Sequence, residues 1–346
     1  MASLQQVLGV ELPIIQAPMA GSQDSRLTVA VANAGGLGSL PCAMLTAEML
    51  RKELATIRAG TAKPYNVNFF CHVPPAFNAE REAAWQAALR PYYAELGVDA
   101  SAIHAAPARA PFSSEMADIL EAFKPPVVSF HFGLPSASLL ARVRAWGARL
   151  LSSATTVEEA RWLAANGVDA IIAQGLEAGG HRGMFLSQDV ATQVGTFALL
   201  PQVVRAVSVP VVAAGGIADA KGVAAAMALG AAGVQIGTAY LLCPEAQTSA
   251  VHRAALASDG AEHTAVTNLF SGRPARGIVN RLMRELGPVN AIAPEFPLAS
   301  AAIAPLRAKA ESRGSGDFSP LWSGQNATGC SERRAADVTR ALAAGL

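Results

Sequence analysis

Eight short apolar runs alternate with helical stretches along the first 260 residues, and this alternation constrains the fold more than any other feature. The runs show little polar–apolar alternation, which is typical of strands buried on both faces of a parallel sheet. The predicted strands are Pro13–Ala17, Gly36–Leu40, Tyr65–Phe70, Val127–Phe132, Arg149–Ala154, Ala170–Gln174, Pro210–Ala214 and Gly233–Gly237. Two intervening helices are well delimited by a cap residue and a glycine, from Thr156 to Gly167 and from Asp219 to Gly230. Strict βα alternation predicts the α/β class and a closed (β/α)8 barrel.

Two segments interrupt this alternation. The first contains a predicted helix, Ala79–Leu96, where one short crossover would suffice, and the second is irregular and then helical. We expect residues 1–260 to form the barrel, with an insertion at about 72–124. Residues 261–346 are expected to pack with the insertion as a smaller, mainly helical cap domain over one barrel mouth.

Composition argues against several classes of partner. The chain has 346 residues and a formal net charge of +1, so it lacks the basic surface of a nucleic-acid-binding or membrane-surface protein. Four scattered cysteines, with no CxxC and no histidine at metal spacing, predict neither a disulfide framework nor a metal site. No apolar run reaches the roughly 20 residues of a membrane span, and no signal peptide precedes the first strand. These features predict a cytoplasmic protein.

Glycines follow the last two predicted strands. Gly215 and Gly216 end one strand, and Gly237 and Thr238 end the next. In a (β/α)8 barrel, the loops after strands seven and eight commonly bind phosphate, because glycine lets backbone N–H groups approach the anion. The pattern therefore predicts a phosphate site, for either a phosphorylated cofactor or a phosphorylated substrate.

Two histidines lie where barrel enzymes carry their chemistry. His131 ends a strand, and an imidazole there suits proton transfer near neutral pH. His181 lies in a glycine-rich loop after the strand that ends at Gln174. Either side chain could instead be structural, and the sequence leaves open which of them transfers protons.

The first and third strands offer contacts for a flat ring. Ala17, Pro18 and Met19 form an apolar edge at the end of the first strand. Asn66 and Asn68 share one face of the third strand, and Asn68 lies nearer the strand end, where its amide could bond a ring carbonyl or a ribityl hydroxyl.

Seven motifs occur together in this order: QAPMAG, NAGGLGSL, NVNFFCH, SFHFG, AQGLEAGGHRG, AAGGI and QIGTAYLLCPE. The set resembles class I of the nitronate monooxygenase family, formerly called 2-nitropropane dioxygenases. The resemblance implies a TIM barrel that binds FMN and uses O2 to convert alkyl nitronates into a carbonyl compound and nitrite, without nicotinamide or metal. By the same resemblance, His131 and His181 are the candidate catalytic residues. The candidate FMN-binding residues are Ala17, Pro18, Met19, Asn68, Gln174, Gly179, Gly180, Gly215, Gly216, Gln235, Ile236, Gly237 and Thr238.

The chain departs from the family pattern near the predicted cap. Phe296, Ser300 and Ala304 stand where class I members carry two tyrosines and a lysine. We therefore expect a less polar pocket mouth without a cation to attract an anionic substrate. The alternatives are an NAD(P)H-dependent flavin reductase of the quinone or enoyl-thioester type, a ligand-binding protein without turnover, and a phosphosugar enzyme. The chain is expected to be a monomer or a homodimer.

Overall fold

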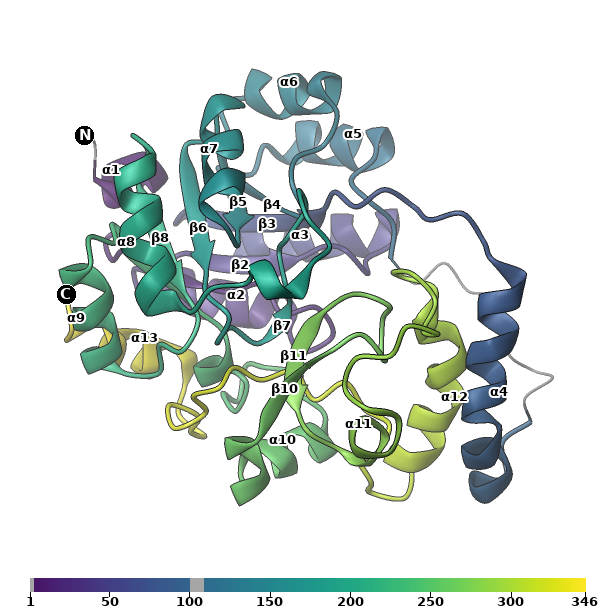
Figure 1. Ribbon diagram of the computed structural model, residues 1–346. Helices are drawn as coiled ribbons and strands as arrows, with labels where there is room; N and C mark the ends of the chain where they lie inside the picture. The colour runs from purple at the N-terminus through teal and green to yellow at the C-terminus, as the bar shows by residue number, and fades with distance from the viewer. Residues whose placement is uncertain (1–2, 100–108) are drawn as a thin grey trace.

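Eight parallel strands form a barrel in the computed structural model, which describes residues 3–99 and 109–346 (Figure 1). The strands are β1 (Ile14–Gln16), β2 (Gly38–Pro41), β3 (Tyr65–Phe70), β4 (Val127–His131), β5 (Arg149–Ala154), β6 (Ala170–Gln174), β8 (Val211–Ala214) and β9 (Gly233–Ile236). Their order is β1-β9-β8-β6-β5-β4-β3-β2, and a parallel bridge from Ile15 to Leu37 joins the two ends of the sheet. The predicted fold class is confirmed, and every predicted strand end lies within two residues of the observed one.

Apolar side chains fill the barrel, and a short helix closes its N-terminal end. Ile15, Leu151 and Ile172 belong to one buried cluster with residues of α1 (Leu4–Leu8). A Cβ on Gly233, the first residue of β9, would lie 2.4 Å from Cδ2 of Leu4, so α1 packs directly on the strand beginnings. A functional site is therefore expected at the opposite end of the barrel, where the strands finish.

Helices surround the barrel, as the alternation predicts. They are α2 (Ser25–Asn33), α3 (Ala47–Gly60), α5 (Ser114–Phe123), α6 (Ala137–Ala145), α7 (Val157–Ala165), α8 (Thr196–Ala206), α9 (Ala220–Ala228) and α13 (Ala335–Ala343). Short 3-10 helices are η2 (Val190–Thr192), η3 (Thr238–Tyr240) and η4 (Asp259–Glu262). The Thr156 and Asp219 side chains accept from the backbone N–H groups of Glu159 and Gly222, as expected of N-caps.

A second body lies beside the open end of the barrel (Figure 1). It contains α4 (Ala79–Leu96), α10 (Ala250–Leu256), α11 (Arg281–Leu286) and α12 (Ala299–Glu311). It also contains a small antiparallel sheet that the sequence did not predict, in the order β10 (Thr264–Thr267), β11 (Ala275–Ile278) and β7 (Gly180–His181). The strand β7 belongs to the loop after β6, so this sheet joins the barrel to the second body.

The helix of the predicted insertion packs on the C-terminal segment. On α4, Trp85 Nε1 donates to the carbonyl of Ala299 at 3.3 Å, and the Tyr93 hydroxyl donates to that of Ala302 at 2.6 Å. Two helices within the expected cap ranges pack elsewhere: α5 contacts α3 and α6, and α13 contacts α2 and α9. The ranges 72–124 and 261–346 therefore include two barrel helices, and residues 100–108 of the insertion lie outside the described residues.

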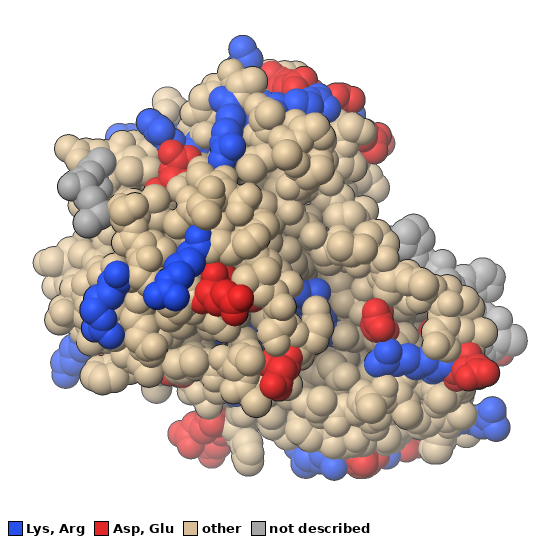
Figure 2. Space-filling view, turned by 45° about the horizontal axis from the view of Figure 1, so that its top comes forward, with Lys and Arg blue, Asp and Glu red and all other residues tan. Residues whose placement is uncertain are grey.

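Charged side chains of both signs are interspersed on the face that Figure 2 shows, over a mostly uncharged surface. Within residues 3–99 and 109–346, no helix combines the length and the apolar character needed to cross a membrane.

Candidate active site

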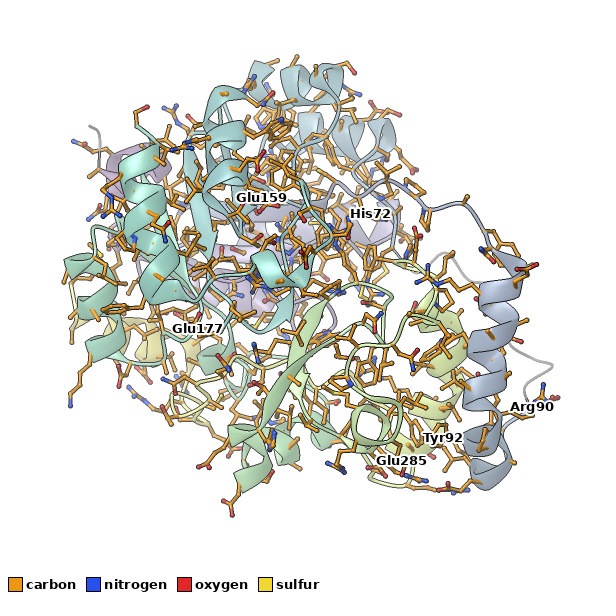
Figure 3. All side chains as sticks on the ribbon, in the orientation of Figure 1. His72, Arg90, Tyr92, Glu159, Glu177 and Glu285 are labelled. Atoms are coloured by element: carbon orange, nitrogen blue, oxygen red, sulfur yellow. The ribbon has the colours of Figure 1, made fainter. Side chains whose placement is uncertain are left out.

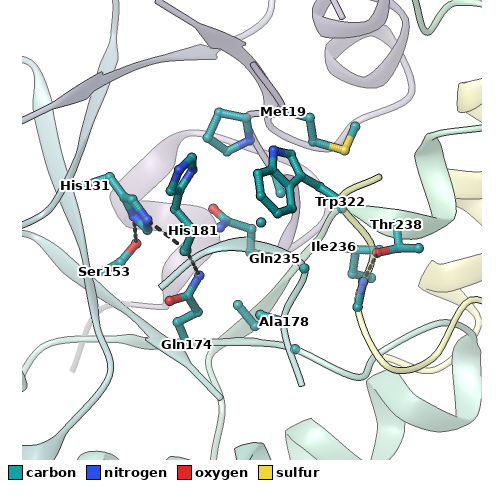
Figure 4. A pocket seen from close by; sticks show the side chains of 18 of the residues that line it. Met19, His131, Ser153, Gln174, Ala178, His181, Gln235, Ile236, Thr238 and Trp322 are labelled. Atoms are coloured by element: carbon teal, nitrogen blue, oxygen red, sulfur yellow. Dashed lines mark hydrogen bonds between the residues drawn. The ribbon is translucent and has the colours of Figure 1, made fainter. Parts of the chain in front are cut away.

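A pocket lies at the C-terminal ends of the barrel strands and brings all the candidate residues together (Figure 4). These residues are Ala17, Pro18, Met19, Asn68, His131, Gln174, Gly179, Gly180, His181, Gly215, Gly216, Gln235, Ile236, Gly237 and Thr238. They come from β1, β3, β4, β6, β8, β9 and the loops that follow them. The arrangement follows from the parallel sheet, because all its strands end on the same side.

Backbone amides without partners lie on one side of this pocket. The N–H groups of Gly179, Gly216 and Gly237 donate to no acceptor among the described residues. Gly215 and Gly216 have φ angles of +119° and +73°, which disfavour any residue with a Cβ. Free amides on a side-chain-free backbone are what an anion such as phosphate requires.

The loop before the C-terminal helix, at residues 323–326, lies against the glycines whose N–H groups are free. The Gly324 N–H donates to Thr238 Oγ1 at 2.9 Å, and Asn326 Nδ2 donates to the carbonyl of Gly216 at 3.2 Å. A Cβ on Gly179 would lie 2.5 Å from the Gly324 nitrogen, so the two loops touch through their backbones. The sequence predicts this segment only as part of the cap and does not reveal that it lines the pocket.

Gln235, which lines the pocket, carries a buried amide oxygen. Gln235 Oε1 is inaccessible to solvent and has no hydrogen-bond partner among the described residues. Leaving such an acceptor unpaired is costly, so a ligand with a hydrogen-bond donor fits there. Asn68 is less available, because its Nδ2 donates to Ser129 Oγ at 2.8 Å.

His131 is held by hydrogen bonds at both ring nitrogens. Nε2 lies 3.2 Å from the carbonyl oxygen of His181, and Nδ1 lies 3.1 Å from Ser153 Oγ (Figure 4). Burial, with the charges of Arg273 and Arg182, lowers the pKa of His131 to about 3, although the bond to the His181 carbonyl opposes this shift. The ring is therefore neutral at pH 7. Since a carbonyl only accepts, Nε2 carries the proton and Nδ1 accepts from Ser153.

His181 presents its ring to the same pocket. Its Nε2 lies 2.8 Å from Ser271 Oγ, whereas its Nδ1 has no hydrogen-bond partner among the described residues. Burial, followed by the nearby charge of Arg109, holds the pKa of His181 well below its usual value. The ring lies beside that of Trp322, tilted by 56° to it, with centroids 5.6 Å apart.

The Gln174 amide fixes the loop that carries His181. Its Nε2 donates to the His181 carbonyl at 3.0 Å, and its Oε1 accepts from the Gly183 N–H at 2.7 Å. Gln174 lines the pocket, but these bonds make it a residue that positions the loop.

Two acidic residues, labelled in Figure 3, hold neighbouring loops. The Glu159 carboxylate is buried and accepts from the Thr155 N–H and hydroxyl, both at 2.7 Å, and from the Phe185 N–H at 2.6 Å. Glu177 accepts from the Thr196 N–H at 2.7 Å. Both carboxylates are engaged with backbone and hydroxyl donors and do not line the pocket.

Three positions differ from the pattern of the family that the sequence resembles: Phe296, Ser300 and Ala304. Phe296 borders the site, and the other two do not. Its buried ring lies 5.3 Å from the ring of His181 and 4.7 Å from that of His72, centroid to centroid. Ser300 donates to the carbonyl of Pro297, and Ala304 is exposed on α12.

Arg109 also lines the pocket, so the expected absence of a cation is wrong. Its guanidinium carbon lies 5.8 Å from the centroid of the Phe296 ring. No sequence pattern indicated this residue, because it lies within the insertion and reaches the pocket only through the tertiary fold.

A sequence profile described as nitronate monooxygenase matches residues 2–343. The chain belongs to the nitronate monooxygenase family. It is 42% identical over 342 residues to the nitronate monooxygenase of Pseudomonas aeruginosa, with 97% of each chain covered. It is also 42% identical over 350 residues to that of Paraburkholderia phytofirmans, covering 98% of this chain and 93% of the relative. A crystal structure described as nitroalkane oxidase, from Streptomyces ansochromogenes, has a TM-score of 0.91 and 38% identity, covering 100% of this chain and 98% of that one.

Membership of the nitronate monooxygenase family confirms the resemblance seen in the motifs. It makes this chain an oxidoreductase that acts on nitronates, in a family that depends on a flavin. The pocket also contains residues outside the seven motifs: Arg109, Ser153, Trp322, Gly324 and Asn326.

Proposed function

We propose that this member of the nitronate monooxygenase family binds FMN in the barrel-top pocket and uses O2 to oxidise alkyl nitronates to a carbonyl compound and nitrite. The observation that carries the proposal is the convergence of unpartnered glycine amides and two neutral imidazoles on one pocket. When bound, the flavin supplies the redox centre that accepts electrons from the nitronate.

The residues of the pocket suit FMN at both of its ends. Gly179, Gly216 and Gly237 would hold the phosphate with their free N–H groups. Gln235 would pair its orphaned Oε1 with a ring N–H of the flavin. Pro18 and Met19 would form the apolar edge beside the rings.

The two histidines have different tasks in this proposal. His131 uses both ring nitrogens within the protein, so it positions the loop of His181. His181 has a free Nδ1 and is the imidazole that contacts the substrate. A neutral imidazole with a lowered pKa is a weak base. A nitronate has already lost its carbon-bound proton and needs no base, so it is the better substrate than the neutral nitroalkane.

The first test is nitrite release in air from FMN-loaded protein given propyl-2-nitronate, with neutral 2-nitropropane in a parallel reaction. Rapid release from the nitronate and slow release from the nitroalkane are expected. Absence of nitrite from both reactions would refute the proposal. The reductase alternative is tested by adding NADH to the same protein without oxygen, because rapid bleaching of the flavin would favour it.

The second test concerns the phosphate. Riboflavin lacks the anion for which the glycine amides are available, so it should bind at least about 100-fold more weakly than FMN. Fluorescence titration measures both affinities. Equal affinities would contradict the assignment of the glycine loops.

A further inference from the structure

His181 carries a single ring proton, and the position of that proton decides what the ring can offer to a ligand. Burial, followed by the charge of Arg109, holds the pKa of His181 far enough down to keep the ring neutral at pH 7. A neutral imidazole donates from one nitrogen and accepts at the other. His181 lines the pocket, and its Nδ1 has no partner among the described residues, so a ligand there meets either a donor or an acceptor.

The other ring nitrogen, Nε2, lies against a buried hydroxyl. Ser271 Oγ is 2.8 Å from His181 Nε2, and this serine is only 1% exposed. Ser271 lies in the loop between β10 and β11, so the contact joins the second body to the loop after β6. The next residue, Gly272, donates its N–H to the carbonyl of Asn268 at 2.8 Å and leaves no room for a Cβ against the carbonyl of Pro294. Tight packing of this loop therefore holds the hydroxyl in place.

The distances around Ser271 Oγ indicate where its one proton goes. Besides His181 Nε2, its hydrogen-bonding neighbours among the described residues are the carbonyl oxygen of Arg273 at 3.4 Å and the N–H of Arg273 at 3.5 Å. The carbonyl lies beyond the roughly 2.5–3.0 Å of an ordinary O–H···O bond, so it competes weakly for the proton. The hydroxyl therefore donates to Nε2 at 2.8 Å and accepts from the N–H of Arg273. Because Nε2 accepts, the ring proton of His181 lies on Nδ1.

The two imidazoles of the pocket then carry their protons on opposite nitrogens. His131 donates from Nε2 to a carbonyl and accepts at Nδ1 from Ser153, so its N–H is directed into the protein. His181 accepts at Nε2 from Ser271, so its N–H is left for the pocket. An N–H suits a nitronate, whose oxygens carry the negative charge and only accept, whereas a bare lone pair on Nδ1 would repel them.

We propose that Ser271 is a positioning residue that fixes the tautomer of His181, so that the Nδ1–H faces the pocket and donates to an oxygen of the nitronate. The inference deepens the proposed function and rests on it for the identity of the ligand, whereas the tautomer itself does not depend on turnover. In this role His181 gives a hydrogen bond and transfers no proton. That agrees with a substrate that has already lost its carbon-bound proton.

The first experiment reads the tautomer directly. Protein labelled with nitrogen-15 histidine, at neutral pH and with or without FMN, gives distinct NMR signals for protonated and unprotonated ring nitrogens. The signals of His181 are those that His181→Asn lacks. In the wild type they should show a protonated Nδ1 and an unprotonated Nε2. Ser271→Ala removes the hydroxyl donor, so a form protonated on Nε2 should appear.

The second experiment measures nitrite release from propyl-2-nitronate by the FMN-loaded protein. Ser271→Ala should lower kcat/KM about tenfold, because the hydrogen bond to a charged oxygen is no longer preorganised. Ser271→Thr keeps the hydroxyl, so it should keep the wild-type tautomer and recover most of the lost kcat/KM. Ser319→Ala is the matched control, because it removes another buried hydroxyl of the second body, which donates to Glu311 at 2.7 Å and lies outside the pocket. It should leave both readouts at their wild-type values.

Failure of the inference and failure of the proposed function give different results. A wild-type His181 protonated on Nε2 would overturn the inference. A Ser271→Ala variant that loses activity but keeps the wild-type tautomer would also overturn it, because the serine would then only brace the ring. Should Ser271→Ala fail to fold, the wild-type signals alone decide between the two tautomers. If the wild type shows the expected tautomer but releases no nitrite, the proposed function fails, whereas the effect of Ser271 on the ring is upheld.

Discussion

The neutral state of His131 predicts how the stability of the protein depends on pH. Burial is the main reason that its pKa falls from 6.5 to about 3 on folding. Because the folded pKa is the lower one, the unfolded chain binds the proton first as the pH falls. The contribution to stability is therefore complete above pH 6.5 and is lost progressively down to about pH 3.

The size of the loss at pH 5 follows from the unfolded state alone. The folded ring is still neutral there, whereas the unfolded ring is protonated 1.5 pH units below its pKa of 6.5. At about 1.36 kcal/mol per unit, protonation of the unfolded chain lowers the free energy of unfolding by about 2 kcal/mol relative to pH 8. The contributions of other titratable groups to the pH dependence cancel when a variant without this imidazole is measured in parallel.

The assay is urea denaturation of wild type and His131→Asn at pH 8 and pH 5, with flavin removed from both so that ligand binding does not contribute. Wild type should lose about 2 kcal/mol more than the variant between the two pH values. His263→Asn, which removes an exposed histidine outside the pocket, should follow the wild type. Equal losses in wild type and His131→Asn would refute the assignment of a buried, neutral imidazole.

Three further predictions concern the loops around the pocket. Gly179→Ala places a methyl group against the C-terminal loop and should weaken FMN binding by about 10- to 100-fold in a fluorescence titration. Gly222→Ala, on α9 and outside the pocket, has a Cβ that meets only ordinary contacts at 3.4 Å or more, so it should bind FMN like the wild type and is the matched control. Gln174→Ala removes both hydrogen bonds to the glycine-rich loop and should cost about 1 to 3 kcal/mol in urea denaturation, with a lower kcat; unchanged values would contradict its positioning role. Glu159→Gln puts an amide N–H against buried donors and should lower the free energy of unfolding by about 2 to 4 kcal/mol, and a neutral outcome would show that the charge is dispensable.

The barrel could be predicted because its signals are local. Each long apolar run is buried on both faces, so composition alone marks it as a strand. The strands of the small sheet carry no such signal. β7 has only two residues, and β11 pairs with it across almost 100 residues of chain, so neither strand exists without the tertiary fold.

The same distinction holds within the pocket. His181 and the glycines after β8 belong to short contiguous motifs and could be assigned to the site from the sequence. Arg109, Trp322 and Gly324 come from irregular segments, and only the packing of the second body against the barrel brings them to the pocket. The departure at Phe296 could be seen in the sequence, but the presence of Arg109 in the same pocket could not, because it lies far from that position along the chain.

One short loop therefore links the barrel side of the pocket to the second body. The carbonyl of His181 accepts hydrogen bonds from His131 and Gln174 of the barrel. His181 also pairs with Ala275 of β11 in the second body. The next residue, Arg182, donates its N–H to the carbonyl of Pro274 at 2.8 Å. A second body that moved away from the barrel would have to break this pairing or carry the imidazole with it. The pocket is complete only when the two bodies are docked, so variants that loosen β11 should impair turnover even though they touch neither flavin nor substrate.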